Sequence, residues 1–500
     1  MNVGLIDRVI QAFSPEAAYR REAFKVALDE VRNYDAGNFD RPNQNWRVSN
    51  QSAELTDRYS RSGVMARARD LERNSDIMNA LVGAFKRNVI GGGFRVQAKT
   101  GDDALNKSLE DLWQRWCKAR NCDVTGTQSL NQMLRMAVWR KKIDGGILFV
   151  KRYTQGGVVP FKVQMVEVDE LDGDIMTPHV KGNRVVGGIE YDRSNRAVGY
   201  FIRRYDIDGY TQVDPVWVGA DDVIFYFTKR RPSQLREMSD MAPSIPRIRD
   251  INEFMLAVAV KQRIEACLSV FIKKQIPATG IGRAGGKPER GGYDGKLISP
   301  GMIKELNAGD EVQVVNPAGQ ATDATSFSKM LQKMIGAGQG VSYEALSRDM
   351  SESNYSSARQ GLIEDDQTYL EEQEHIIGIL DELYETFVIS AVQCGAVEIP
   401  GFWEDKRDYL AHEWTKEPRP WIDPQKEANA TATALRTGQK TYEQIAAENG
   451  RDWRDQVDDI AEVVEYGTER GVDMGAIMFG YVQEHGQEET ENDEGGKRDG

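Results

Sequence analysis

The chain has 500 residues, of which 40% are hydrophobic and 28% charged, and its formal net charge is -14 at pH 7. This length allows about two to four domains with a substantial buried core, and the composition is typical of a folded globular protein. The excess of 78 acidic over 64 basic residues excludes a protein whose task is tight, non-specific adhesion to phosphate backbones.

Neither a membrane segment nor a secretory signal is expected. The longest apolar stretch, FMLAVAV at residues 254–260, is far shorter than the roughly 20 residues that span a bilayer. Apolar residues recur at helical spacing between positions 5 and 13, but no cationic lead or cleavage site frames them, which favours an intracellular protein. The four cysteines form no CxxC pair and are expected to be free thiols.

The first part of the chain is predicted to be helical. Residues 1–35 have the pattern of a helix, and residues 36–60 are too polar to pack a core alone, which indicates an extended arm on a neighbour or else a disordered linker. Three glycines at 91–93 predict a turn rather than a phosphate loop. The next predicted helices cover residues 62–87, 102–120 and 128–142.

In the middle of the chain the hydrophobic pattern changes from helical to strand-like and then becomes helical again. Residues 146–228 contain short β-branched and aromatic runs between Gly, Asn and Asp turns, which predicts mostly antiparallel strands. Prolines precede the longest apolar helix, at residues 245–275. A glycine-rich loop at 279–296 and a compact strand-bearing piece at 297–319 follow this helix.

The rest of the chain is predicted to be mostly helical. A helix at 326–335 precedes the polar segment MSESNYSSARQGLIEDD, residues 350–366, and a long helix from about 354 to 390 has one apolar stripe. Thr441 and Gln444 have the spacing of a capping box among small terminal helices. The last eighteen residues are acidic, lack apolar anchors and are expected to be disordered.

The sequence offers no credible active site. The stretch GIGRAGGKPE approaches a phosphate-binding loop, but its glycine spacing is wrong and proline replaces the Ser or Thr that would bind Mg²⁺. The four histidines are scattered and lack the i, i+4 pairing of a zinc site. We therefore predict no enzyme activity, no catalytic residues, no cofactor and no bound metal.

One acidic cluster leaves an alternative open. Asp169, Asp172 and Asp174 carry the oxygen ligands that Mg²⁺ prefers, which would suit a Mg²⁺-dependent DNA-processing nuclease. They match no familiar metal-site spacing, so a strand exit rich in Asp and Gly is the favoured interpretation. The basic residues at 229–236 form either a solvated face or a contact with acidic neighbours in an assembly. Long interrupted helices, a polar arm and strongly patterned faces favour an assembly protein, and a structural scaffold without a channel is one alternative.

Five blocks of the sequence resemble, in order, those of the lambda-type portal proteins of tailed bacteriophages. They contain an arginine-rich helix that ends in three glycines, a β-hairpin, and the motifs Arg-Pro-x-Gln-x-Arg, Asn-Tyr-Ser-Ser-x-Arg and Trp-x-Asp-Pro-x-Lys-Glu. The blocks lie at residues 66–96, 187–206, 225–254, 349–366 and 418–453. The sequence departs from the family at Glu237, which follows the arginine where the family has glycine, and this puts the local turn in doubt.

The resemblance implies an α+β portal subunit with a helical and β wing, a long-helix stem, a small α/β clip and a helical crown around a central channel. It implies a homo-oligomeric ring, normally of twelve subunits, at the capsid vertex, with the terminase large subunit, the major capsid protein and the head-tail connector as partners. Double-stranded DNA would pass through the channel with weak, non-specific contacts, which an acidic chain suits. The protein would belong to the virion after assembly in the host cytoplasm, without membrane contact.

The domain boundaries that follow from this resemblance are an N-terminal helix and arm (1–60), wing (61–242), stem helix (243–276), clip (277–321), second stem helix (322–337), tunnel loop (338–355), wing and crown helices (356–480) and a disordered acidic tail (481–500).

The resemblance also suggests which residues act in the channel and on the stem. We expect the tunnel loop to touch DNA phosphates transiently through polar groups, or else to be a plain helix start capped by Ser353 or Asn354. The candidate loop residues are Arg348, Asp349, Ser351, Glu352, Asn354 and Tyr355. The candidate stem residues are Lys261, Arg263, Lys273 and Lys274.

Overall fold

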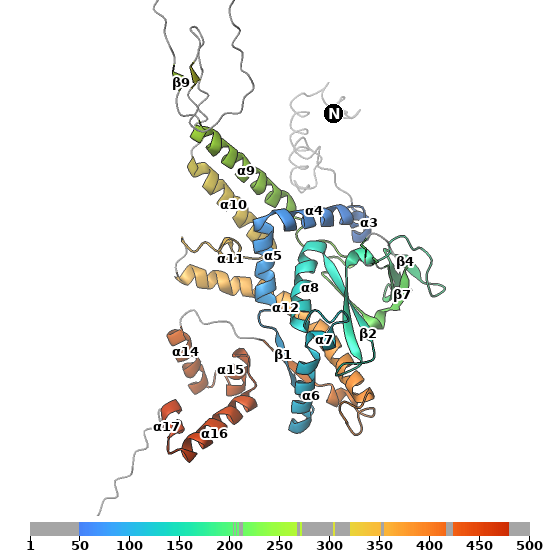
Figure 1. Cartoon of the computed structure of the whole chain (residues 1–500), viewed down its shortest axis with the longest axis vertical. Coiled ribbons are helices and arrows are strands. Elements are labelled where there is room, and N and C mark those ends of the chain that lie inside the picture. The colour runs from blue at the N-terminus through green and yellow to red at the C-terminus, as the bar shows by residue number, and fades with distance from the viewer. Residues whose placement is uncertain are drawn as a thin grey trace, which may run out of the picture. The chain divides into compact units, whose positions relative to one another are not determined.

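The computed structural model divides the chain into two units, Met1–Thr56 and Asp57–Gly500 (Figure 1). In the first unit, only residues 50–56 are described, and they include most of helix α3 (Ala53–Asp57). The described residues are 50–203, 205–206, 208–209, 214–267, 271–272, 304–305, 321–351, 355–416 and 424–479.

The predicted helix at 62–87 is two helices, α4 (Arg61–Asn74) and α5 (Asp76–Val89). The break falls at Ser75, whose extended backbone lets its side chain accept a hydrogen bond from the Met78 N–H and cap α5. The prediction of one helix was wrong because the extended backbone at Ser75 ends α4 and starts a new helix. The predicted glycine turn is confirmed, since Gly91 and Gly93 have φ of 52° and 115°.

Three helices follow: α6 (Asp103–Trp116), the short α7 (Ala119–Cys122) and α8 (Leu130–Asp144). Asp102 caps α6, and Ser129 with Gln132 forms a capping box at the start of α8. Gly145 ends α8 with φ of 95°, and a Cβ at this position would lie 2.5 Å from the carbonyl carbon of Met238. Only glycine fits there without strain.

The predicted antiparallel β region is confirmed and forms two sheets. The first has the order β3-β2-β8 and the second the order β4-β5-β6-β7. An unpredicted third pair joins β1 to β11, from distant parts of the chain. The strands are β1 (Phe94–Ala98), β2 (Gly146–Tyr153), β3 (Phe161–Val166), β4 (Arg184–Val186), β5 (Ile189–Tyr191), β6 (Ala197–Ile202), β7 (Val216–Gly219), β8 (Val223–Phe227) and β11 (His412–Lys416), with 3-10 turns η2 (Val168–Glu170) and η3 (Ala220–Asp222).

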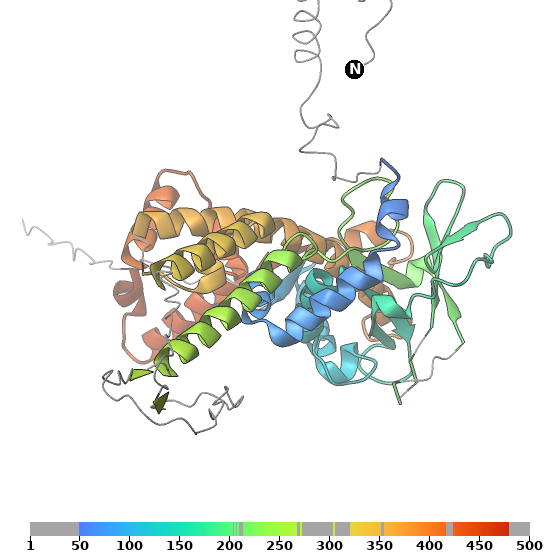
Figure 2. The ribbon, with the colours of Figure 1, turned by 90° about the horizontal axis from the view of Figure 1, so that it is seen from above.

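Two long helices run side by side, α9 (Ile245–Cys267) and α10 (Ala321–Gln339), as Figures 1 and 2 show. Phe254 and Phe327 pack edge to face between them, with ring centroids 5.0 Å apart. Short strands β9 (Phe271–Ile272) and β10 (Lys304–Glu305) pair in parallel beyond α9.

The short helix α11 (Tyr343–Ser347) and the long helix α12 (Tyr355–Gln393) follow α10. The apolar stripe of α12 is buried in the main core, where Phe85 of α5 meets Tyr369 and Trp113 of α6 meets Tyr384 and Phe387. The core therefore fixes the position of α12 against α5 and α6.

The last elements are α13 (Lys406–Tyr409), α14 (Pro424–Arg436), α15 (Tyr442–Glu448), α16 (Trp453–Glu469) and α17 (Met474–Phe479). The predicted capping box of Thr441 and Gln444 is confirmed at the start of α15. Residues 481–500, predicted to be a disordered tail, lie outside the described residues. None of the helices in the described ranges is both long and apolar enough to cross a bilayer.

Candidate functional site

The segment between α10 and α12 is more ordered than the predicted tunnel loop at 338–355. Helix α10 continues to Gln339, and residues 343–347 form α11, so the expectation of a loop along the whole segment was wrong. The reason is local: the Ser342 hydroxyl accepts from the Ala345 N–H at 3.2 Å and caps α11. Leu346 of α11 is buried in the main core.

Two contacts with α12 hold the base of α11. The Thr368 hydroxyl donates to the Gly340 carbonyl at 2.6 Å, where Gly340 turns the chain with φ of 71°. The Asp365 carboxylate accepts from the Ser342 N–H at 2.6 Å and from the Ser342 hydroxyl at 2.7 Å. Burial raises the pKa of Asp365, and the hydrogen bonds from Ser342 oppose that rise.

Beyond α11 the chain is exposed. Arg348 ends the helix in the left-handed conformation, with φ of 58°, and its N–H donates to the Glu344 carbonyl while its side chain is exposed. The Asp349 carboxylate accepts from the Ser351 N–H at 3.0 Å and lies 3.9 Å from Lys329. Hydrogen bonds from Ser351 are the main reason that the pKa of Asp349 is lowered.

Only part of the predicted loop set can be placed. The structure brings Arg348, Asp349 and Ser351 together at the tip of this segment. Glu352 and Asn354 lie outside the described residues, as do the proposed helix cap at 353–354 and the side chain of Tyr355.

Sequence analysis missed a neighbour of this tip, Arg87 at the end of α5. Burial and the nearby charge of Arg348 lower the pKa of Arg87. Arg87 is exposed, so two cationic side chains gather beside the segment. Arg87 lies in the block at residues 66–96 that resembles the portal family, but nothing in the sequence indicated that α11 would pack on α5.

A buried ion cluster joins α12 to α8 and β8. Lys142 lies 3.1 Å from the Asp240 carboxylate and 3.2 Å from the Glu372 carboxylate, and Lys141 and Tyr226 also bind Glu372. Burial opposes ionisation of Glu372, but the charges of Lys142 and Lys141 lower its pKa to about 2. Burial likewise opposes the charge of Lys142, but Asp240 and Glu372 raise its pKa.

The two inner lysines of this cluster are balanced by its two carboxylates. Two lysines face two carboxylates, so the charges balance without a ligand, and Arg230 adds an outer contact to Asp240 at 3.1 Å. A cavity of about 300 Å³ lies beside it, between α8, α10 and α12. The cluster ties α12, which holds the base of α11 through Asp365 and Thr368, to α8 and β8.

The unusual Glu237 is also part of a buried ion pair. Its carboxylate accepts from Arg236 at 2.7 and 2.8 Å, and its backbone carbonyl accepts from the Nε of Arg61 at 2.9 Å. Arg236 further donates to the carbonyl of Val168 at 3.1 Å. The turn that a glycine would allow is thus fixed by charge-assisted hydrogen bonds.

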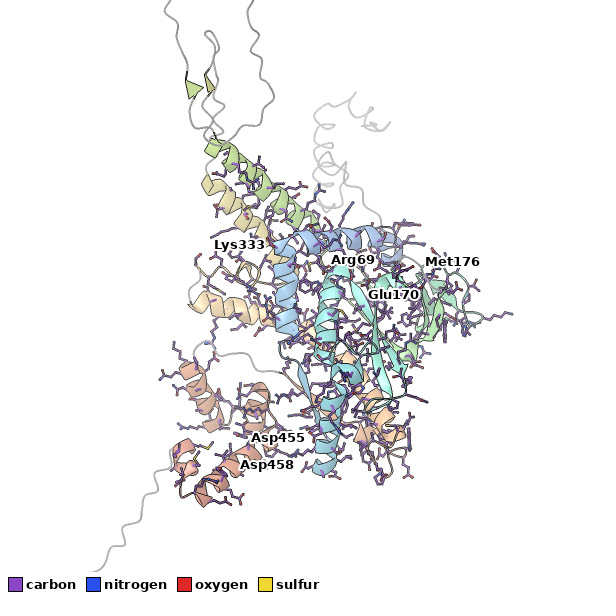
Figure 3. The ribbon with its side chains drawn as sticks, viewed as in Figure 1. Arg69, Glu170, Met176, Lys333, Asp455 and Asp458 are labelled. Atoms are coloured by element: carbon purple, nitrogen blue, oxygen red, sulfur yellow. The ribbon has the colours of Figure 1, made fainter. Side chains whose placement is uncertain are left out.

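The three aspartates of the nuclease alternative do not converge on a metal site. Asp169 binds Arg69 at 2.5 Å, and Asp172 binds Arg203 (Figure 3 labels Arg69). The backbone N–H of Asp174 donates to Asp172 at 3.0 Å. Two of the three carboxylates are thus paired with arginine side chains. Across the described ranges no three His, Cys, Asp or Glu side chains are grouped so that they could hold a metal ion.

The predicted stem residues fall on α9 or beyond it. Lys261 is half-buried and Arg263 exposed, both on α9, while Lys273 and Lys274 lie outside the described residues. The large apolar side chains exposed on the two long helices are Met255, Leu256 and Val260 on α9 and Phe327, Met330 and Met334 on α10.

With this architecture in place, the comparisons identify the family. The family model for the phage portal protein, lambda family, matches residues 39–373, and the chain belongs to this family. It is a family of structural components of phage particles, not of enzymes.

Two phage proteins named as a portal or probable portal protein are similar to this chain. A probable portal protein of Halomonas phage phiHAP-1 is 24% identical over 411 residues, which cover 79% of each chain. Portal protein B of Escherichia phage lambda is 21% identical over 477 residues, 86% of this chain and 89% of the relative. A solved chain from the virion of a native gene transfer agent particle aligns over 71% of this chain and 89% of its own, with 12% identity and a TM-score of 0.32.

Proposed function

We propose that this protein assembles into a closed homo-oligomeric ring at the capsid vertex and forms the channel through which DNA is packaged and ejected. Family membership supports this function. The single observation that carries it here is the α9–α10 pair, which exposes large apolar side chains along both helices. Such surface is costly in water and is typical of an interface.

The two helices present these side chains away from their mutual contact. Phe254 on α9 faces α10, whereas Leu256 and Val260 lie four residues apart on the opposite face of α9. On α10, Met330 and Lys333 line an open groove of about 630 Å³ (Figure 3 labels Lys333). The outward face of α9 from one subunit fits this groove in the next, a head-to-tail contact that closes a ring.

In this proposal α9 and α10 are the stem, and the elements from α4 to β8 are the wing. The residues between α9 and α10 form the clip that docks the terminase large subunit and later the head-tail connector, while α14 to α17 form the crown. Arg348 and Ser351 are carried by an anchored helix, α11, so they reach toward DNA from a defined base. The outer wing would meet the major capsid protein.

The ring is tested by size-exclusion chromatography with light scattering, followed by electron microscopy of the same fraction. We expect closed rings with a central channel, near twelve times the chain mass of 56.2 kDa. A stable monomer at micromolar concentration would contradict the proposal, and a large assembly without a channel would favour a structural scaffold.

The stem interface has a matched pair of variants. Met330→Glu places a charge in the α10 groove and should abolish or strongly weaken the ring. Met176→Glu changes the same residue type at a more exposed site in the β region and should leave the ring intact (Figure 3). Equal effects of the two variants would remove the stem from the interface.

A further inference from the structure

Helix α12 has a strongly acidic face, and the described part of the chain leaves most of its acids uncovered. Helix α12 contains nine Asp and Glu residues but only one Lys or Arg. Its buried residues, such as Tyr369, Ile376 and Leu383, lie on one side, and helical spacing places the exposed acids on the opposite side. The acidic stripe consists of the exposed Glu364, Glu371, Glu374 and Glu385 together with the half-buried Asp381 and Glu382.

Several of these acids have little to balance them within the chain. Glu382 pairs with Lys151 at 2.6 Å, and Asp381 accepts from Trp414 at 2.7 Å. Glu371 and Glu385 are exposed, and neither forms an ion pair within the ranges that the structure describes. Like charges at helical neighbours repel, so a cationic surface should cover the stripe in the assembled state.

A matching basic surface lies on helices α4, α5 and α8. Together these helices carry ten Lys and Arg but only four Asp and Glu, and eight of the ten lie outside the buried cluster that contains Lys141 and Lys142. Between them is a shallow hollow of about 350 Å³, which we call the basic hollow. It is lined by Glu72, Lys86, Gln132, Arg135, Met136, Trp139 and Arg140.

The charges in the basic hollow can accept a further carboxylate. Its acid, Glu72, already binds Arg140 and accepts from the Trp139 Nε1 at 2.6 Å. Lys86 lies over the Trp139 ring, 4.8 Å from its centre, and no acid is paired with it in the described part of the chain. A cation placed over an aromatic face still offers its other hydrogen-bond donors to an anion.

The two surfaces point away from each other, which excludes their pairing within one chain. Phe85 of α5 packs on Tyr369 of α12, so these helices meet through their buried faces. Lys86 lies over Trp139 of α8, and among the described residues none from α12 lines the basic hollow. In the view from above, α4 and α12 lie on opposite sides of the α9–α10 pair (Figure 2).

We propose that the basic hollow of one subunit receives the acidic stripe on α12 of the next, forming a second, electrostatic layer of the subunit interface beside the apolar stem contact. The occupant is a second copy of this chain, because the complementary charges are on opposite flanks of one subunit. This inference rests on the proposed ring. Such contacts set orientation and register more than affinity.

The test reverses charge on each surface separately and then mixes the variants. Lys86→Glu with Gln132→Glu makes the basic hollow acidic, and a Glu after Ser129 keeps the capping box of α8. Glu371→Lys with Glu385→Lys makes the stripe basic. Each variant alone should lose the ring in light scattering, whereas an equimolar mixture should recover it, since alternating subunits restore opposite charges at every contact.

The outcomes separate this inference from the proposed function. Wild-type protein that forms no ring would refute the proposed function itself. Normal rings from each variant alone would overturn only the inference, as would folded variants whose mixture stays monomeric. If the basic-hollow variant keeps its ring but loses affinity for double-stranded DNA, the surface binds DNA instead.

Two charge-neutralising variants serve as the test if a charge-reversal variant fails to fold. Lys86→Gln and Glu371→Gln each remove one charge, and each should weaken subunit association by about tenfold per contact. The measurement is the salt concentration at which rings dissociate, with Arg193→Gln in the exposed β5–β6 turn as the control. Dissociation at the wild-type salt concentration would overturn the inference.

Discussion

Asp365 of α12 holds Ser342 by both its backbone N–H and its hydroxyl, at 2.6 and 2.7 Å. Through this contact a carboxylate on the long helix fixes the turn from which α11 starts. Asp365 is only 3% exposed, so its hydrogen bonds are made without competition from bulk water. The position of the tip at residues 348–351 is therefore set by α12.

Replacing this carboxylate should cost stability according to what replaces it. Asp365→Ala leaves the Ser342 donors without partners and should lower the free energy of unfolding by about 1–3 kcal/mol. Asp365→Asn keeps an acceptor and has no charge to bury, so it should stay near wild type, consistent with the raised pKa of Asp365. Thermal and urea unfolding of both variants check this. Equal losses would mean that the charge, not the hydrogen bonds, holds the turn.

Glu372 should make stability depend on acid pH. Because its pKa is lowered to about 2, its contribution is fully present above the pKa of the unfolded state, about 4.5, and is lost as the pH falls toward 2. Glu372→Gln leaves two buried lysines with only Asp240 and should cost about 3–5 kcal/mol at neutral pH. The difference from wild type should narrow between pH 5 and pH 3.

Urea unfolding at several pH values measures this difference, with the exposed Glu404→Gln as the control. A gap between wild type and Glu372→Gln that is constant across the acid range would contradict the role given to the buried cluster.

Alanine substitutions at two glycines with positive φ, Gly101 and Gly145, distinguish the cost of backbone strain from the cost of a steric clash. Gly101 has φ of 83° with open space around it, so Gly101→Ala should cost only about 1–2 kcal/mol. Gly145 has φ of 95°, and a Cβ there would meet the backbone at Met238 and Ser239 within 2.8 Å. Gly145→Ala should therefore be clearly the more destabilising change in thermal unfolding. Similar melting temperatures would show that the 238–239 backbone moves freely.

Local signals accounted for much of the fold. The capping box of Thr441 and Gln444, the glycine turn at 91–93 and the alternating strands at 146–228 depend on residues close in sequence, and each was predicted. Contacts between segments that are distant in the sequence could not be predicted in this way. The pairing of β1 with β11 and the burial of Leu346 depend on where whole elements pack.

The same division applies to the candidate site. The polar segment that contains Arg348 could be found from a family motif, but its short helix depends on a contact between Ser342 and Asp365, which are 23 residues apart in the sequence. Lys142 and Glu372 likewise gave no signal, since isolated charged residues on helices are usually solvated. In the folded chain Lys142 and Glu372 are both buried and form an ion pair.

The last prediction concerns DNA contact by Arg348 and its neighbour Arg87. If the tip faces the channel, Arg348→Ala should weaken binding of rings to double-stranded DNA and lower its salt dependence by about one phosphate contact per engaged subunit. Arg87→Ala should act in the same direction, because the two cations lie close enough for Arg348 to lower the pKa of Arg87. Asp349→Ala should strengthen binding by removing a negative charge beside them.

Fluorescence anisotropy of labelled DNA over a range of salt concentrations measures these effects on intact rings. Arg193→Ala, an equally exposed arginine in the β5–β6 turn, is the matched control and should leave both affinity and salt slope unchanged. If Arg348→Ala and Arg193→Ala lower the slope alike, the effect belongs to net charge and the tip is not in the channel. If only Arg348→Ala and Arg87→Ala lower it, the anchored α11 segment is the part of the subunit that touches the passing DNA.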